Sequence, residues 1–218
     1  MCGRYMITTT FAAMASLFDA EPVTPGSNAL SPDAPRLNVS PTETVPAVVS
    51  RAGARRIEPM RWGLLPPWHR SPKQPPLLIN ARAETIAEKP AFRDAARERR
   101  CLIPADGFYE WQGEKGSKIP YLIRPRAGGP IAFAGVWQEW GPPAERILTC
   151  AIVTCAANAT LAPIHDRMPV VIAPADFALW LGEAGHGAAP LMVPAPDDAL
   201  VATPADAETR RILARRGG

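Results

Sequence analysis

Residues 101–112 read Cys101-Leu102-Ile103-Pro104-Ala105-Asp106-Gly107-Phe108-Tyr109-Glu110-Trp111-Gln112, and the fold depends on this stretch. Its first four residues form a short apolar run that is typical of a buried segment, and its aromatic second half is typical of a strand. On that strand Glu110 lies on the face opposite Tyr109 and Trp111. A carboxylate there is partly desolvated and can both give and accept a proton. The alternative is a Glu on the solvent face of the strand or paired with an arginine.

Short elements are expected in the rest of the chain, because 26 of its 218 residues are prolines, which favour rigid turns over long helices. Alternating patterns and turn residues predict strands at residues 2–8, 45–50, 55–62, 119–123, 131–137, 147–156 and 170–172. Helical spacing and capping residues predict helices at residues 11–18, 90–99, 174–181 and 205–215. Loops are expected up to Leu37, from Trp68 to Asn80 and from Leu161 to Pro169. The pattern predicts one mixed α+β domain over residues 1–218.

The composition excludes several classes of protein. Hydrophobic residues make up 47% of the chain, which is enough for one sizeable core, but no run of about 18 apolar residues could span a membrane. The N-terminus lacks a basic region followed by an apolar run, so we expect an unsecreted, cytoplasmic protein. We also expect it to be a monomer. Neither a metal-ligand cluster nor a phosphate-binding glycine loop occurs, so no metal and no small-molecule cofactor is expected. The cysteines fit no zinc spacing, and reduced core residues are expected at Cys101, Cys150 and Cys155.

Basic residues concentrate in residues 51–100, which hold twelve Arg and Lys against five Asp and Glu. Such a segment suits a polyanion, although a solvated basic face is the commoner explanation. The segment also contains Trp62 and Trp68, which flank a loop rich in Gly and Pro. An exposed indole there could stack on an unpaired base and contribute about 1–3 kcal/mol. A place in the core is the alternative for each tryptophan, and we favour it for Trp62.

The N-terminal sequence Met1-Cys2-Gly3-Arg4-Tyr5 offers covalent chemistry. If Met1 is removed, which a small second residue permits, the chain begins with an α-amine and a thiol on adjacent carbons. The two groups have pKa values of about 8 and about 8.5 in model peptides, and the adjacent ammonium lowers the thiol pKa further. Such an aminothiol traps an aldehyde first as an imine and then as a thiazolidine ring. The alternative is that Cys2 is one of four scattered cysteines beside a start codon.

Two more polar side chains could serve such chemistry. His165 stands beside Asp166 and Arg167 in a loop, and imidazole changes its protonation readily near neutral pH. Asn80 offers a neutral amide that can orient an amine or a sugar oxygen without adding charge. A loop histidine is more often structural than catalytic, and an asparagine often caps a turn or a helix, so both alternatives stay open.

Six ordered motifs lie within residues 2–172. They are Cys2-Gly3-Arg4-Tyr5, Leu37-Asn38-Val39-Ser40-Pro41-Thr42, Arg61-Trp62-Gly63-Leu64-Leu65-Pro66, Asn80-Ala81-Arg82-Ala83-Glu84-Thr85, the stretch from Arg100 to Trp111, and His165-Asp166-Arg167-Met168-Pro169. Together they resemble the SRAP (SOS response-associated peptidase) family of abasic-site processing proteins. The resemblance implies a curved, barrel-like β core flanked by short helices. It also implies a DNA-repair protein of the SOS response that crosslinks itself to abasic sites in single-stranded DNA.

The resemblance further implies a role for each matching residue. Cys2 would be the nucleophile that forms a thiazolidine with the ring-opened abasic deoxyribose. Asn80 would position the amine and the sugar, Glu110 would handle protons, and His165 would assist ring opening. The family is also described as having a peptidase-like self-processing activity, which exposes Cys2, and a lyase activity that can follow the imine.

DNA contacts are implied in the same way. Arg4 and Arg82 match phosphate contacts that flank the lesion, and a guanidinium fork suits two phosphate oxygens. We predict two further DNA contacts, Pro41 in the second motif and Trp68 as an exposed indole. The chain departs from the family pattern at Glu43, which places an extra carboxylate near this surface, and in the atypical tail after about residue 193.

Two other functions remain open. A cysteine hydrolase could use Cys2, His165 and Asn80 as nucleophile, base and orienting residue, although the local signatures of papain-like enzymes are absent. A non-catalytic module could bind single-stranded DNA through residues 51–100 and Trp68. A covalent product with abasic DNA separates the crosslinking function from both.

Overall fold

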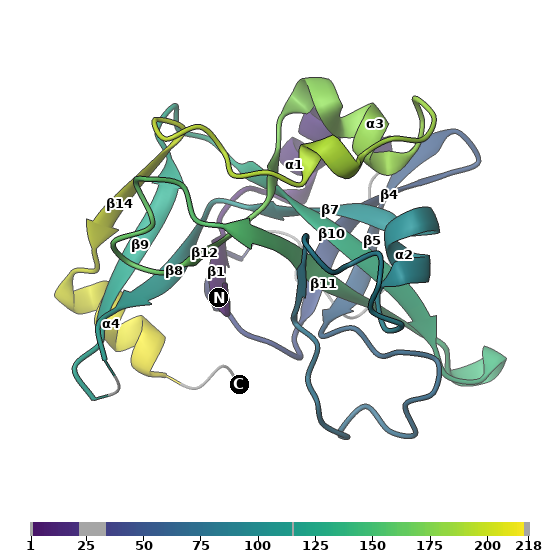
Figure 1. Ribbon diagram of the computed structural model, residues 1–218, viewed down its shortest axis with the longest axis horizontal. Coiled ribbons are helices and arrows are strands. Elements are labelled where there is room, and N and C mark those ends of the chain that lie inside the picture. Colours follow the sequence, from purple (N-terminus) through teal and green to yellow (C-terminus); the bar gives the residue numbers. More distant parts are fainter. Residues whose placement is uncertain (1, 22–33, 115, 216–218) are drawn as a thin grey trace.

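Two β-sheets form most of the protein, and the computed structural model describes residues 2–21, 34–114 and 116–215 (Figure 1). The larger sheet runs in the order β12 (Arg167–Pro169), β11 (Ile147–Ala156), β10 (Ile131–Trp140), β7 (Arg100–Ala105), β4 (Thr44–Arg51), β5 (Ala54–Trp62) and β2 (Ala20–Glu21). Two short strands join it, β6 (Asn80–Arg82) beside β11 and β13 (Val171–Ile172) beside β10. The smaller sheet runs in the order β14 (Leu200–Pro204), β9 (Ile119–Pro125), β8 (Gly107–Gln112), β1 (Arg4–Ile7) and β3 (Arg36–Val39).

The larger sheet closes on itself. Strand β11 pairs antiparallel with β10 and also pairs parallel with β5, where Thr149 lies opposite Arg61 and Cys150 opposite Trp62. The path from β11 through β10, β7, β4 and β5 therefore returns to β11. Closure removes the unpaired edges that an open sheet exposes. The prediction of a mixed α+β fold with a curved, barrel-like core is thus confirmed.

Residues 101–112 join the two sheets. Their apolar half is β7 in the closed sheet, and their aromatic half is β8 in the smaller sheet. Between them stands Asp106, whose carboxylate accepts the backbone N–H groups of Thr8 and Thr9. The end of β1 is therefore held at the same joint, which fixes the N-terminal strand relative to both sheets.

Short helices flank the sheets. They are α1 (Phe11–Phe18), α2 (Arg93–Glu98), α3 (Phe177–Leu181) and α4 (Ala207–Ala214), with 3-10 turns at Pro143–Glu145, Pro174–Asp176 and Ala189–Leu191. Helix α1 has its predicted bounds because the Thr10 side chain accepts the N–H of Ala13 as a helix cap. The Phe18 and Phe177 rings stack at 5.0 Å and hold α1 against α3. Figure 1 shows these two helices together at one side of the core and α4 at another.

Several elements differ from the sequence prediction. Strands β3, β6, β12 and β14 fall in segments predicted as loops or left unassigned. Each has five residues or fewer, so it is held by a neighbouring strand and not by a hydrophobic pattern of its own. Helix α2 begins at Arg93 and not at Pro90, because residues 90–92 form turns. Most of the loop predicted before Leu37 falls in residues 22–33, which lie outside the described residues.

Candidate active site

Cys2 lies two residues before β1 begins and is fully buried. Two contacts of Tyr5 fix this strand, because its ring packs edge-on against Trp62 at 5.2 Å and against Phe133 at 5.9 Å. Aromatic pairs at such distances favour this T-shaped arrangement. The strand also pairs with β8 on one side and β3 on the other. The thiol of Cys2 therefore stands at a defined place beside the closed sheet.

Asn80 reaches Cys2 from a segment far away in the sequence. Its side-chain Nδ2 donates to the backbone carbonyl of Cys2 at 3.0 Å. Strand β6 carries Asn80 because it pairs parallel with β11, where Asn80 lies opposite Ile152. The other amide atom, Oδ1, is buried and makes no hydrogen bond within the described part of the chain. Asn80 is thus positioned by one hydrogen bond and keeps an acceptor available for a bound group.

Glu110 lies on the face of β8 that points into the core. It is 4% exposed, and its neighbour Tyr109 stands opposite Arg4 in the pairing of β8 with β1. Burial, above all, and then the negative charge of Glu110 raise the pKa of the Cys2 thiol. The expectation of a lowered thiol pKa concerns the chain without Met1, whose Cys2 amine is free, and it stays a prediction. In the chain that carries Met1, burial outweighs the effects that lower this pKa.

The side chain of His165 is held in a turn by the backbone of Arg167, two residues further on. Its Nδ1 lies 2.9 Å from the amide nitrogen of Arg167, whose N–H the neutral ring accepts. The same Nδ1 lies 2.8 Å from the Asp166 carboxylate, to which a protonated ring would donate. Gln112, at the end of β8, donates from Nε2 to the carbonyl of Pro163 at 2.9 Å and so ties this turn to the strand of Glu110.

Arg167 and Glu84 form a pair that the sequence analysis did not single out. Two guanidinium nitrogens of Arg167 donate to the two carboxylate oxygens of Glu84 at 2.6 and 2.8 Å, and one of them also donates to the Thr154 carbonyl at 2.7 Å. The hydrogen bonds from Arg167 hold the pKa of Glu84 below its usual range. The pair connects the turn of His165 with the segment after Asn80. Both residues occur in the motifs, but sequence spacing cannot show that they meet.

A groove of about 700 Å³ runs from Asn80 along a basic and apolar surface. Arg82, Trp68 and Lys89 line it together with residues 77–79 and 90–92. Trp68 is 59% exposed. Trp62 instead is buried and donates from its indole nitrogen to the carbonyl of Ile79. The groove therefore joins a predicted catalytic residue, Asn80, to two predicted DNA contacts.

The turn that carries Pro41 is held against the end of β5. Thr42 follows it with a φ of 78°, and its N–H donates to the carbonyl of Trp62 at 2.7 Å. The Glu43 carboxylate accepts the N–H of Ser40 and pairs with Arg36. Glu43 is thus engaged within its own turn and with β3, and the expectation that it adds a carboxylate near the DNA surface stays a prediction.

The family model for "SOS response associated peptidase (SRAP)" matches residues 1–211 of this chain. The chain belongs to the SRAP family. It is 38% identical over 183 residues to "Abasic site processing protein YoaM" of Bacillus subtilis, covering 83% of this chain and 79% of that protein. It is also 34% identical over 200 residues to "Abasic site processing protein YedK" of Escherichia coli, with coverage of 86% and 82%.

Solved structures agree with this SRAP fold. A protein from Bacteroides thetaiotaomicron superimposes with a TM-score of 0.84 at 24% identity and covers 99% of this chain and all of that one. A protein from Bordetella bronchiseptica superimposes with a TM-score of 0.78 at 25% identity and covers 94% of this chain. The first likeness, at its low identity, concerns the fold alone.

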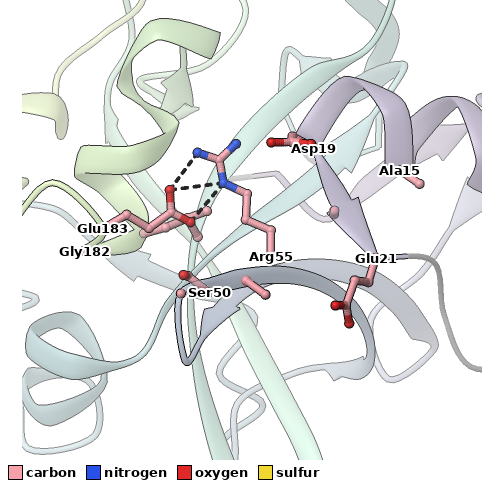
Figure 2. A pocket seen from close by; sticks show the side chains of 11 residues that line it. Ala15, Asp19, Glu21, Ser50, Arg55, Gly182 and Glu183 are labelled. Carbon is pink, nitrogen blue, oxygen red and sulfur yellow. Dashed lines mark hydrogen bonds and ion pairs between the residues drawn. The ribbon is translucent and has the colours of Figure 1, made fainter.

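A second hollow of this SRAP chain, of about 840 Å³, lies between α1, the turn from β4 to β5 and the end of α3 (Figure 2). Arg55 points into it beside Asp19, and its guanidinium donates to Glu183 at 2.7 and 2.9 Å and to the Phe18 carbonyl at 2.9 Å. None of the predicted catalytic residues lines this hollow. Since the one arginine that enters it is already engaged, the groove beside Asn80 is the better candidate for the site.

The residues that the structure describes lack two kinds of feature. No three His, Cys, Asp or Glu side chains among them come together in a way that could hold a metal ion. No helix within them is both long enough and apolar enough to cross a membrane.

The thiols of the native chain that retains Met1 are expected to react slowly with a disulfide reagent. All four cysteines are free and buried, and burial raises the pKa of Cys150 to about 12 and of Cys155 to about 11. Because the thiolate is the reactive form, we expect rates at about pH 8 that are at least about 100-fold below those of the unfolded chain. Stopped-flow absorbance measures both rates. One thiol that reacts at the unfolded rate in the native chain would contradict this geometry.

Thr42→Gly is expected to raise the free energy of unfolding by about 0.5–1 kcal/mol. A Thr with positive φ is strained by about 1–2 kcal/mol, and the added freedom of a glycine in the unfolded chain offsets part of the relief. Thr44→Gly is the matched control, because Thr44 lies in regular β4 and should lose about 1 kcal/mol. Urea unfolding measures both. A larger loss at Thr42 than at Thr44 would show that the Thr42 side chain contributes more than its strain costs.

Proposed function

We propose that this SRAP chain processes abasic sites in single-stranded DNA by crosslinking itself to them through Cys2. One observation carries the proposal: Asn80 and Glu110, from β6 and β8, converge on Cys2, one by a hydrogen bond to its carbonyl and the other by its charge. The relatives' names add the substrate, since they are abasic site processing proteins. An abasic deoxyribose opens to an aldehyde, which is the partner that an aminothiol requires.

The proposed reaction begins when Met1 leaves and frees the Cys2 amine. The amine adds to the aldehyde carbon, and loss of one water gives an imine. The thiol then adds across the carbon–nitrogen double bond: sulfur bonds to carbon, and the thiol proton goes to nitrogen. Nothing is oxidised or reduced, so the reaction needs no cofactor. It does need proton transfers, first to the departing water and then to the ring nitrogen.

Three side chains of the predicted site are proposed to supply these transfers or to orient the reacting groups. Glu110 is buried beside the thiol and can take a proton from one group and give it to another. His165 is proposed to assist opening of the deoxyribose ring, and its turn is tied to the strand of Glu110 through Gln112. Asn80 is proposed to hold the amine and the sugar, because its Oδ1 is buried and can accept a hydrogen bond.

DNA on either side of the lesion would lie along the groove. Arg82 is exposed and makes no ion pair with any described residue, so its guanidinium is available for a phosphate. Trp68 offers an exposed indole for an unpaired base. We assign Arg4 and Pro41 to the DNA as well, on the β1 and β3 side of Cys2. Among the residues that the structure describes, no acidic side chain lines the groove, which suits a polyanion.

The imine is a branch point. Removal of a proton from the carbon next to it would expel the 3′ phosphate and nick the strand, which is the proposed lyase activity. Closure by the thiol instead protects the strand. Because the thiol and the amine of Cys2 stand on adjacent carbons, the thiol is always within reach of the imine carbon, and we propose that ring closure is the main outcome. The self-processing peptidase activity that removes Met1 is proposed on the family description alone.

The test uses the wild-type protein with Met1 removed and an oligonucleotide that contains one abasic site. We expect a product that survives denaturing electrophoresis and whose mass equals protein plus DNA minus one water. Peptide mapping should place the DNA on Cys2. Salt-sensitive binding without a covalent product would favour the binding module, and turnover of a peptide in trans would favour the hydrolase. Either result in place of the adduct overturns the proposal.

A further inference from the structure

Helix α4 contacts β3, which pairs with the N-terminal strand β1 in the smaller sheet. Figure 1 shows α4 on the same side of the molecule as β9 and β14. Along β3, Val39 pairs with Tyr5 and both are fully buried, so the neighbouring Asn38 belongs to the opposite, outer face. The Asn38 side chain donates at 3.0 Å to the carbonyls of both Ile212 and Arg215. The C-terminal end of α4 is therefore fixed to β3, next to the motif that carries Pro41.

Two arginines at this end of α4 are exposed. They are Arg211 and Arg215, and neither side chain makes a hydrogen bond or an ion pair with any of the residues that the structure describes. Elsewhere in the chain, arginines such as Arg36 and Arg55 are held by glutamates. The last turn of a helix normally repels anions through its free carbonyl groups. Here the Asn38 amide occupies two of these carbonyls and so weakens that repulsion.

Arg4 extends this basic surface towards Cys2. It pairs with Tyr109 across β1 and β8, on the face opposite the one that carries Tyr5, and thus shares the outer face with Asn38. Its guanidinium bonds only to the carbonyl of its neighbour Gly3 and to no carboxylate among the described residues. Arg4 and Asn38 are separated by about two residues along the strand direction and by one strand spacing, which gives a distance of roughly 8 Å. A flexible single strand can span that distance within a few nucleotides.

We infer that Arg211 and Arg215, presented by α4 and Asn38, bind phosphates of the single-stranded DNA on the Arg4 side of the lesion. This inference rests on the proposed function, because it extends the DNA path beyond the site at Cys2. The C-terminal helix is then part of the DNA-binding surface of this chain, although its sequence departs from the family pattern. The contact is electrostatic and independent of base sequence.

The test measures binding of single-stranded oligonucleotides that contain a non-reactive abasic analogue, by fluorescence anisotropy over a range of salt concentrations. The variant is Arg211→Ala with Arg215→Ala. We expect the slope of log affinity against log salt to become shallower by about 1.4, since each phosphate contact on a single strand contributes about 0.7. This change in slope should occur with DNA that extends on both sides of the analogue. It should disappear with one of the two oligonucleotides that are truncated at the analogue, namely the one that lacks the DNA on the Arg4 side.

The controls separate this contact from other effects. Arg56→Ala with Arg146→Ala removes the same charge from exposed arginines that pair with Glu21 and Glu139, and it should keep the wild-type slope. Arg211→Lys with Arg215→Lys should also keep it. A role in stabilising α4 alone would lower the unfolding midpoint and leave the slope intact, which would overturn the inference, as would equal slopes for both alanine variants. Adduct formation by the wild-type protein on the shortest oligonucleotide tests the proposed function separately.

Discussion

Cys2→Ala is expected to abolish the denaturant-stable adduct and to lower its rate of formation by at least about 10³-fold, because the variant keeps an amine but has no sulfur to close the ring. The imine that it can still form is reversible. The side chain is small and buried, so the loss of one sulfur should cost only about 1 kcal/mol of stability. Denaturing electrophoresis over a time course gives the rate, and thermal unfolding confirms that the variant is folded.

Three matched variants complete this experiment. Cys101→Ala removes an equally buried thiol from β7 and should leave the adduct unchanged. Cys2→Ser should form an imine that borohydride traps but no ring that is stable to denaturant. A chain that keeps a short extension before Cys2 should do neither, because its amine is acylated. Wild-type adduct yield in Cys2→Ala or in the extended chain would show that another residue is the nucleophile.

Long elements of the fold could be predicted from local patterns. Strand β11, Ile147–Ala156, has its predicted bounds because a run of ten residues rich in Ile, Val and Thr suits only a strand between two partners. Closure of the larger sheet could not be predicted. It depends on the parallel pairing of Cys150 with Trp62, two residues far apart in sequence, and neither strand carries a signal for its second neighbour.

Residue chemistry alone predicted less of the candidate site than local patterns predicted of the fold. An N-terminal Cys, a buried Glu and an amide were each recognised as reactive or orienting groups, but only the fold brings Asn80 to the carbonyl of Cys2. Strand β6 is too short and too polar to show a pattern, so the position of Asn80 follows from its pairing with β11. The ion pair of Arg167 with Glu84 was missed for the same reason, since a pair of opposite charges 83 residues apart is one among many possible pairs.

The pKa of Cys2 shows a further limit of sequence reasoning. A free N-terminal ammonium beside a thiol lowers the thiol pKa, and this is correct for a solvated peptide. In the folded chain that carries Met1, burial acts in the opposite direction and the charge of Glu110 adds to it. Burial depends on where β1 packs, which the residues before it do not reveal. The same burial keeps the thiol of the chain that carries Met1 protonated and therefore slow to react.

Glu110→Gln is expected to lower the rate of adduct formation by about 10²-fold at neutral pH, which is the contribution typical of a positioned acid or base. The amide has nearly the same shape as the carboxylate, so we expect the fold to be kept, with a change in stability within about 1 kcal/mol. Glu139→Gln is the matched control, because Glu139 is a partly exposed carboxylate on β10 that pairs with Arg146. Single-turnover kinetics with an abasic oligonucleotide measure the rates.

The sign of this effect separates two roles of Glu110. Its negative charge raises the pKa of the Cys2 thiol, so the glutamine variant should have a more acidic thiol and more thiolate at neutral pH. If Glu110 acted on the reaction only through that pKa, Glu110→Gln would form the adduct faster than the wild type. A slower reaction despite the more acidic thiol is the outcome expected for a group that moves protons at the amine and the departing water. An unchanged rate would exclude both roles and leave Glu110 as a part of the core.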